Sequence, residues 1–174
     1  MTDDLTFAPA TVIAERLRRG DLTPTQVVDA YLDRIARRND RLNAYVTVRR
    51  EAAREEAREA ERALAAGEPV GPLHGVPVAV KDLFAYHAGT RHTYGSRVFE
   101  DYVPERSAPV VDRLEAAGAI VIGKTNTPEF GLGCWTHNRV AGETGTPFAP
   151  DRISGGSSGG AGAALGDRLV PIAQ

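Results

Sequence analysis

The sequence predicts an α/β fold, in which a helical N-terminal segment precedes part of a mixed, mostly parallel β-sheet covered by helices. Residues 1–67 carry apolar side chains at helical spacing, whereas residues 68–174 are rich in Gly and Pro and contain short β-branched runs. In addition, a strand, a helix and a second strand follow one another over residues 76–126, as in a right-handed βαβ unit. We expect one domain across all 174 residues.

Three helices are predicted in the N-terminal segment. Residues 10–20 end on a glycine suited to the left-handed position after a helix. Residues 23–39 begin with Thr23 as an N-cap, and Gln26 three residues later completes a capping box. Residues 49–67 are rich in Ala, Arg and Glu, with Glu–Arg pairs three residues apart. This charge run predicts a solvated helix face rather than a binding patch.

The second part of the chain carries the predicted sheet. Residues 76–82 and 119–126 read as buried strands, and residues 108–118 read as a helix between them, with Ser107 as its N-cap. Because a parallel sheet is usually covered on both faces, we expect helices on both sides of these strands. Residues 127–156 are expected to be loops because glycine and proline recur there.

A Gly-Ser segment, ISGGSSGGAGAALG at residues 153–166, requires an explanation. A flexible linker is typically longer and leads into a new polar segment. A P-loop needs a lysine after its second glycine, which is missing. The G-x-S-x-G pattern of a nucleophile elbow should follow a strand, and Pro147 and Pro150 make residues 146–153 a poor strand. A backbone-shaped catalytic loop followed by a small-residue helix remains.

Lys81 is the first candidate catalytic residue. It stands at the carboxyl end of a predicted strand, where sites in open α/β sheets gather. Burial lowers the pKa of a lysine, and a neutral lysine can act as a base toward a hydroxyl. Two structural alternatives are equally open at this point, namely an ion pair with Asp82 and a lysine that extends to the surface.

Composition excludes several classes of partner. Twenty-one Lys and Arg against 23 Asp and Glu give a net charge of −2, which argues against nucleic acid or an anionic membrane as the main partner. No apolar run approaches the ~20 residues that span a bilayer, and the acidic N-terminus lacks signal-peptide features. Cys134 and His137 form an isolated C-x-x-H pair, and the three other histidines form no cluster. We expect a cytoplasmic protein with no metal and no cofactor.

Several segments together resemble the amidase signature family. They are residues 71–84, 107–133, 146–165 and 169–173, in the order and spacing of that family. The most specific feature is the combination of G-V-P-x-x-V-K-D with a later G-G-S-S-G-G. Residues 22–46 also look like the helical lead-in of the family, so the resemblance covers nearly the whole chain.

The resemblance implies a reaction and a set of site residues. Enzymes of this family hydrolyse or transfer carboxamides through a Ser-Ser-Lys triad. Lys81 is similar to the base of that triad, and Ser157 falls where the family has its bridging serine, held in a cis peptide. Ser158 is similar to a serine that supports the hydrogen-bond network. The surrounding glycines, which allow close approach and positive φ, are Gly155, Gly156 and Gly159.

The third member of the triad, the nucleophilic serine, belongs to a Gly-Thr-Asp-x-Gly-Gly-Ser motif that follows residues 169–173 in the family. That motif is absent, and the sequence stops at Gln174. We therefore expect a single, incomplete amidase domain that is inactive alone and whose completed site acts on a small-molecule amide. Alternatives are a split enzyme, a part similar to the A-subunit of a tRNA-dependent amidotransferase, and a non-catalytic binding module.

Two further expectations concern surfaces. The loop at residues 131–138 follows a strand end, so Cys134 and Trp135 are predicted to line a substrate pocket, with plain packing an equal alternative for Trp135. A sheet of two or three strands leaves an unpaired edge. We therefore expect a homodimer or another association through that edge.

Overall fold

The structure is a computed structural model that describes residues 5–174. Its helices are α2 (Ala10–Arg18), α3 (Pro24–Leu42), α4 (Arg50–Ala65), α5 (Pro109–Ala116) and α6 (Gly159–Gly166), with short 3-10 turns η1 (Arg97–Phe99) and η2 (Glu129–Gly131). Its strands are β1 (Tyr45–Val48), β2 (Pro77–Lys81), β3 (Ile120–Thr125), β4 (His137–Asn138), β5 (Gly142–Glu143), β6 (Gly145–Thr146), β7 (Ala149–Ile153) and β8 (Ile172–Ala173). No helix within this range is long and apolar enough to cross a membrane.

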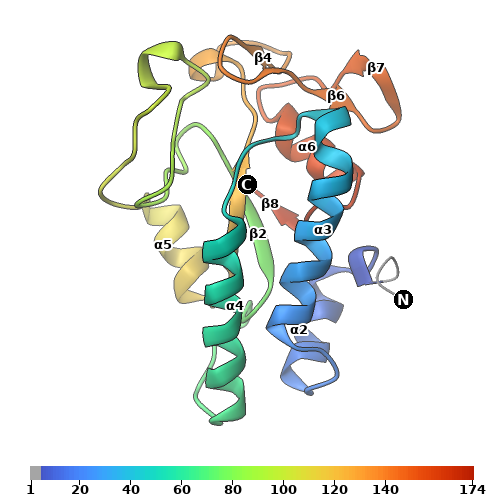
Figure 1. Cartoon of the computed structure of the whole chain (residues 1–174), viewed down its shortest axis with the longest axis vertical. Helices are drawn as coiled ribbons and strands as arrows, with labels where there is room; N and C mark the ends of the chain where they lie inside the picture. Colours follow the sequence, from blue (N-terminus) through green and yellow to red (C-terminus); the bar gives the residue numbers. More distant parts are fainter. Residues whose placement is uncertain (1–4) are drawn as a thin grey trace.

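The main sheet has four strands in the order β1-β3-β2-β8. Strand β2 runs parallel to β3 and β8, whereas β1 is antiparallel to β3. The strands lie between α5 on one side and α3 and α6 on the other (Figure 1). The predicted α/β class, with a mixed and mostly parallel sheet covered by helices, is therefore confirmed.

The alternation of side chains along β2 determines where the site lies. Val78 and Val80 belong to the apolar cluster that includes Val111 of α5, whereas Ala79 belongs to the larger cluster under α2, α3 and α6. Successive residues of a strand point to opposite faces. Lys81 therefore shares the face of Ala79, toward α6, and the next residue turns toward the α5 side.

The N-terminal helices form as predicted, with ends that differ from the predicted ones by at most three residues. The capping box is present, because Thr23 Oγ1 accepts from the Gln26 amide at 3.2 Å and Gln26 Oε1 accepts from the Thr23 amide at 3.0 Å. The charge run of α4 is solvated on its outer face, where Arg58 and Glu55 pair with about half of each side chain exposed. Its alanines face α3 and β3 in the core.

Two local predictions were wrong, and one strand was missed. Ser107 does not cap α5, because its hydroxyl accepts from the Ala88 amide at 2.9 Å and Ala108 occupies the cap without a side-chain bond. The residues before α4 form strand β1, which the sequence analysis did not predict. The loop region 127–156 contains two small hairpins, β4–β5 and β6–β7. Strand β7 covers most of residues 146–153, which the sequence analysis expected to be a poor strand.

Candidate active site

Lys81 and Ser157 are brought together although 75 residues separate them in the chain. Lys81 is the last residue of β2, and Ser157 lies in the loop that leads into α6. The ammonium nitrogen Nζ donates to Ser157 Oγ at 2.7 Å. Lys81 is 6% exposed, and burial lowers its pKa. Within residues 5–174, no carboxylate lies at ion-pair distance from it, so its partner is a hydroxyl.

Asp82 faces the opposite side of the sheet and does not pair with Lys81. Its carboxylate accepts from the Thr93 amide at 3.1 Å and from Thr93 Oγ1 at 2.5 Å, and His92 Nδ1 lies 3.2 Å away. Burial raises the pKa of Asp82, but the bonds from His92 and Thr93 outweigh burial and hold that pKa below its ordinary value. The alternative of a Lys81–Asp82 ion pair is therefore wrong.

The loop around Ser157 depends on glycines because other backbones approach it closely. Gly155 has φ +77°, and the Gly156–Ser157 peptide bond is cis. A Cβ on Gly156 would lie 2.8 Å from the backbone of Trp135, and a Cβ on Gly159 would lie 2.3 Å from Thr136 Oγ1. Such distances leave no room for a side chain at either position.

Two threonines that the sequence analysis missed hold this loop. Thr136 Oγ1 donates to the Gly155 carbonyl at 2.8 Å and accepts from the Gly159 amide at 3.0 Å. Thr127 Oγ1 donates to the Ser157 carbonyl at 3.3 Å. The only available signal was that Thr127 closely follows the end of a predicted strand. Its contact with Ser157 spans 30 positions in the sequence.

Ser158 is exposed, and its hydroxyl has no hydrogen-bond partner among residues 5–174. The structure therefore does not bring Ser158 into the network that the resemblance implies. Cys134 is exposed, and 53% of Trp135 is exposed. Their backbones pack against the glycines of the serine loop, but neither side chain lines the aromatic cavity beside Leu83. That they line a substrate pocket therefore stays a prediction.

A buried polar cluster fixes the loops that follow β3. Asn126 Nδ2 donates to Thr144 Oγ1 at 2.9 Å, and Asn138 Nδ2 donates to Asn126 Oδ1 at 2.7 Å. The Gly160 amide of α6 donates to the Asn126 carbonyl at 3.3 Å. This cluster therefore connects the end of β3 to the start of α6. Among the described residues, no group of His, Cys, Asp or Glu has the arrangement of a metal site.

Comparison with known proteins identifies the family. The sequence model of the Amidase family matches residues 26–174. This chain belongs to the amidase family. The resemblance to amidase signature enzymes is thus confirmed, and the pair of Lys81 and Ser157 lies inside the matched region.

Relatives of known name and structure agree with this membership. The chain is 44% identical over 153 residues to the A-subunit of glutamyl-tRNA(Gln) amidotransferase from Thermosynechococcus vestitus, covering 88% of this chain and 32% of that protein. It superimposes on a bacterial aryl acylamidase of the amidase signature family with TM-score 0.88 and 38% identity, covering 96% of this chain and 35% of that one. A 6-aminohexanoate cyclic dimer hydrolase bound to substrate gives TM-score 0.88 and 35% identity, with 98% and 34% covered. The chain thus spans about a third of the length of these proteins.

Proposed function

We propose that Lys81 and Ser157 are the base and the proton-relaying serine of a Ser-Ser-Lys site that cleaves carboxamide C–N bonds. The observation that carries this proposal is the 2.7 Å contact between Lys81 Nζ and Ser157 Oγ at a buried position. A lysine with a lowered pKa and no carboxylate partner gives up its proton more readily, and the neutral amine accepts a proton from a hydroxyl.

The proposed chemistry moves one proton along two serines. A nucleophilic serine attacks the amide carbonyl and passes its proton to Ser157 Oγ, while Ser157 passes its own proton to Lys81 Nζ. The C–N bond breaks when the amine leaves with that proton, which returns from Lys81 through Ser157. Water then attacks the acyl-serine ester by the same relay, releases the carboxylic acid and restores the serine hydroxyl.

We further propose that these 174 residues do not catalyse this reaction alone. The sequence contains no Gly-Thr-Asp-x-Gly-Gly-Ser motif to provide the nucleophile and the amides around it. Loss of a single oxyanion donor already costs about 10²–10³ in rate. A site without nucleophile and donors is therefore expected to lack measurable turnover.

A second candidate function concerns the amine that is released. The relative with 44% identity is named as the A-subunit of glutamyl-tRNA(Gln) amidotransferase. In that case, the same Lys81–Ser157 pair would act on a glutamine side chain and release ammonia for transfer. Turnover of glutamine would favour the amidotransferase function, and turnover of an aryl amide would favour the amidase function.

The test uses the chain alone and a chimera in which residues 1–174 replace the matching third of the Thermosynechococcus vestitus protein. We expect no turnover of glutamine or acetanilide by the chain alone, and turnover of at least one of them by the chimera. Lys81→Ala and Ser157→Ala in the chimera should each lower kcat by about 10³ or more, because the relay then lacks a member.

Glu55→Ala is the control, because this half-exposed side chain of α4 pairs with Arg58 on the outer face of the helix and is not part of the site. It should leave kcat within about twofold. Amide hydrolysis by the chain alone that disappears in Ser157→Ala would make Ser157 the nucleophile and contradict the relay. A chimera that turns over normally with Lys81→Ala would contradict the proposal altogether.

We also propose that copies of this chain associate through the edge of the main sheet. Within residues 5–174, β8 pairs with β2 on one side only and ends the sheet. An open strand edge offers unpaired amides and carbonyls to another strand. We expect concentration-dependent association of the purified chain in analytical ultracentrifugation, and a single monomeric species across micromolar to millimolar concentrations would contradict it.

A further inference from the structure

The two members of the candidate pair are held in place in different ways. Lys81 ends strand β2, and its backbone is fixed by pairing with Thr125 of β3. Ser157 lies in residues 154–158, the serine loop, which belong to no helix or strand. Within residues 5–174, no amide of residues 155–158 donates to a protein group. The position of the serine loop therefore depends on contacts from other segments.

One hydroxyl, that of Thr136, holds both ends of the serine loop. Its Oγ1 donates to the Gly155 carbonyl at 2.8 Å and accepts from the Gly159 amide at 3.0 Å. A single oxygen thus holds the backbone on both sides of Ser157. Thr136 is 0% exposed, and a Cβ on Gly159 would lie 2.3 Å from Oγ1. The contact from Thr127 Oγ1 to the Ser157 carbonyl is longer, at 3.3 Å, and holds one point only.

Thr136 is in turn anchored to the core of the protein. Its carbonyl accepts from the Thr144 amide at 3.0 Å. The Thr144 hydroxyl donates to the Asn43 carbonyl at 2.7 Å and accepts from Asn126 Nδ2 at 2.9 Å. Asn43 directly follows α3, and Asn126 directly follows β3. Thr136 therefore fixes the serine loop relative to β3, the strand that also pairs with Lys81.

We propose that Thr136 is a positioning residue for the pair of Lys81 and Ser157. Its hydroxyl holds the serine loop where Ser157 Oγ can give its proton to Lys81 Nζ, so this role rests on the proposed function. The two atoms are 2.7 Å apart, and proton transfer needs a separation of about 2.6–3.2 Å. A misplacement of ~1 Å can cost about 10² in rate. Thr136 bonds to the backbone on either side of Ser157, so it acts through the loop and not on the reacting atoms.

The chain alone tests this role without any turnover. Burial lowers the pKa of Lys81. Thr136→Val removes both hydrogen bonds and keeps the shape of the side chain, so the loosened loop should let water reach Lys81 Nζ. The NMR signal of the Lys81 side chain should then titrate at a higher pH than in the original chain. Lys124 is the internal control, because it is fully buried on the α5 face and should titrate as before.

Two further variants separate the hydroxyl from a general loss of packing. Thr136→Ser keeps the hydroxyl, so Lys81 should titrate as in the original chain. Thr90→Val is the matched control, because Thr90 is also buried and its hydroxyl contacts His87 Nδ1 at 2.9 Å, on the side of α5. It should leave the titration of Lys81 unchanged.

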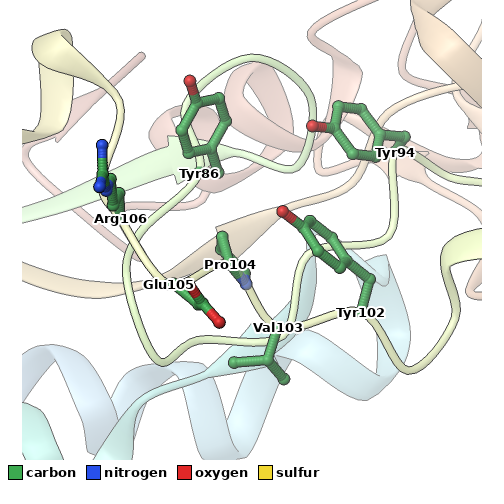
Figure 2. Close-up of a pocket in the computed structure, with 7 residues that line it drawn as sticks. All are labelled: Tyr86, Tyr94, Tyr102, Val103, Pro104, Glu105 and Arg106. Carbon is green, nitrogen blue, oxygen red and sulfur yellow. The ribbon is translucent and has the colours of Figure 1, made fainter.

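A last control removes a hydroxyl from a cavity that the serine loop does not line. Figure 2 shows this cavity of about 530 Å³, and all of its lining residues, Tyr102 among them, come from residues 86–106. Tyr102→Phe should therefore also leave the titration of Lys81 unchanged.

The chimera described above gives the effect on turnover. Thr136→Val should lower kcat about 10–100-fold and leave KM within about threefold, because the relay and not substrate binding is disturbed. Thr136→Ser should keep kcat within about threefold of the original chimera.

Several results would overturn the role of Thr136. They are an unmoved Lys81 titration in a folded Thr136→Val chain, and an equal shift in Thr136→Ser or Thr90→Val. Thermal melts check that each variant is folded, and Thr136→Ala replaces Thr136→Val if the latter does not fold. Loss of folding in both would make Thr136 a residue of the fold alone.

The proposed function fails on a different result. Normal turnover by a chimera with Lys81→Ala would contradict the amide chemistry. A chimera that loses turnover with Lys81→Ala but keeps it with Thr136→Val would contradict only the positioning role.

Discussion

The chain has two lysines, and their surroundings differ in a way that separates the proposed catalytic role of Lys81 from the structural role of Lys124. Lys81 ends β2, points toward α6 and contacts one hydroxyl, that of Ser157. Lys124 lies in β3, is fully buried, donates to the Ala85 carbonyl and lies near the Asp82 carboxylate. Burial lowers the pKa of both. The difference is in the partners, because those of Lys124 only accept hydrogen bonds, whereas the hydroxyl partner of Lys81 also carries a proton that it can give to the lysine.

The same contrast separates the two faces of the sheet at the end of β2. On the α6 face, the loop around Ser157 is exposed in part. On the α5 face, Asp82, His92 and Lys124 are each no more than 1% exposed and connect β2, β3 and residues 85–93. We infer that the α5 face stabilises the fold and that the α6 face carries the chemistry.

The largest expected effect on stability is on the α5 face. Asp82→Ala leaves the Thr93 amide and Thr93 Oγ1 without their acceptor in a buried site and removes the carboxylate that lies 3.2 Å from the His92 ring, which should cost about 2–4 kcal/mol in the free energy of unfolding. The pKa of Asp82 is lowered by folding, so this contribution is present above its ordinary pKa and is lost as the pH falls through the folded value. Urea unfolding at pH 7 measures it.

Glu55→Ala is the control for this measurement, because its ion pair with Arg58 is about half exposed. It should change the free energy of unfolding by no more than about 0.5 kcal/mol. An Asp82→Ala variant as stable as the Glu55→Ala variant would contradict the structural role of the α5 face.

The next largest effect is a change in the free energy of unfolding with pH that Lys124 causes. Burial lowers its pKa to about 8, although Asp82 opposes this. Between that pH and the ordinary value near 10.5, the unfolded chain binds a proton that the folded chain lacks, so stability should rise with pH across this window. Between pH 8 and pH 10, the free energy of unfolding should increase by on the order of 2 kcal/mol.

Lys124→Met removes the titrating group and supplies the comparison. The rise in the free energy of unfolding between pH 8 and pH 10 should be clearly smaller in this variant than in the original chain, because only the contribution of Lys81, whose pKa is also lowered, remains. Urea unfolding at a series of pH values measures both rises. An equal rise in both chains would show that another group is responsible.

The smallest expected effect is that of Lys81 on stability. Lys81→Met removes a buried charge that the folded state disfavours, and this gain offsets the lost hydrogen bond to Ser157. The free energy of unfolding at pH 7 should therefore change by less than about 1 kcal/mol. A loss of several kcal/mol would mean that Lys81, like Asp82, is a structural residue.

Features of the fold and the site that depend on residues close together in the sequence can be predicted from the sequence. The capping box of α3, the strand–helix–strand order and the place of Lys81 at a strand end all follow from spacing within a few residues. The alternation of side chains along a strand also predicts that Lys81 and Asp82 lie on opposite faces of the sheet. The role of each residue in the proposed chemistry was available only through the family resemblance.

What could not be predicted depends on contacts between distant segments. Thr136 and the backbone of Trp135 fix the serine loop from about 20 residues away, and no spacing rule connects them to it. Strand β1 is four residues long and forms by pairing with β3, so its own sequence gives a weak signal. Ser107 matched an N-cap pattern, but the Ala88 amide competes for its hydroxyl from a different loop.

The most direct test of the account is an NMR titration of the two lysine side chains with ¹³C- and ¹⁵N-labelled lysine. The chain has two lysines, so Lys81→Met assigns both signals. We expect Lys124 to titrate near pH 8 and Lys81 also to titrate below the ordinary lysine value of about 10.5. A Lys81 signal that titrates at or above that value would mean that its amine is held charged, and it would contradict the claim that Lys81 accepts a proton from Ser157.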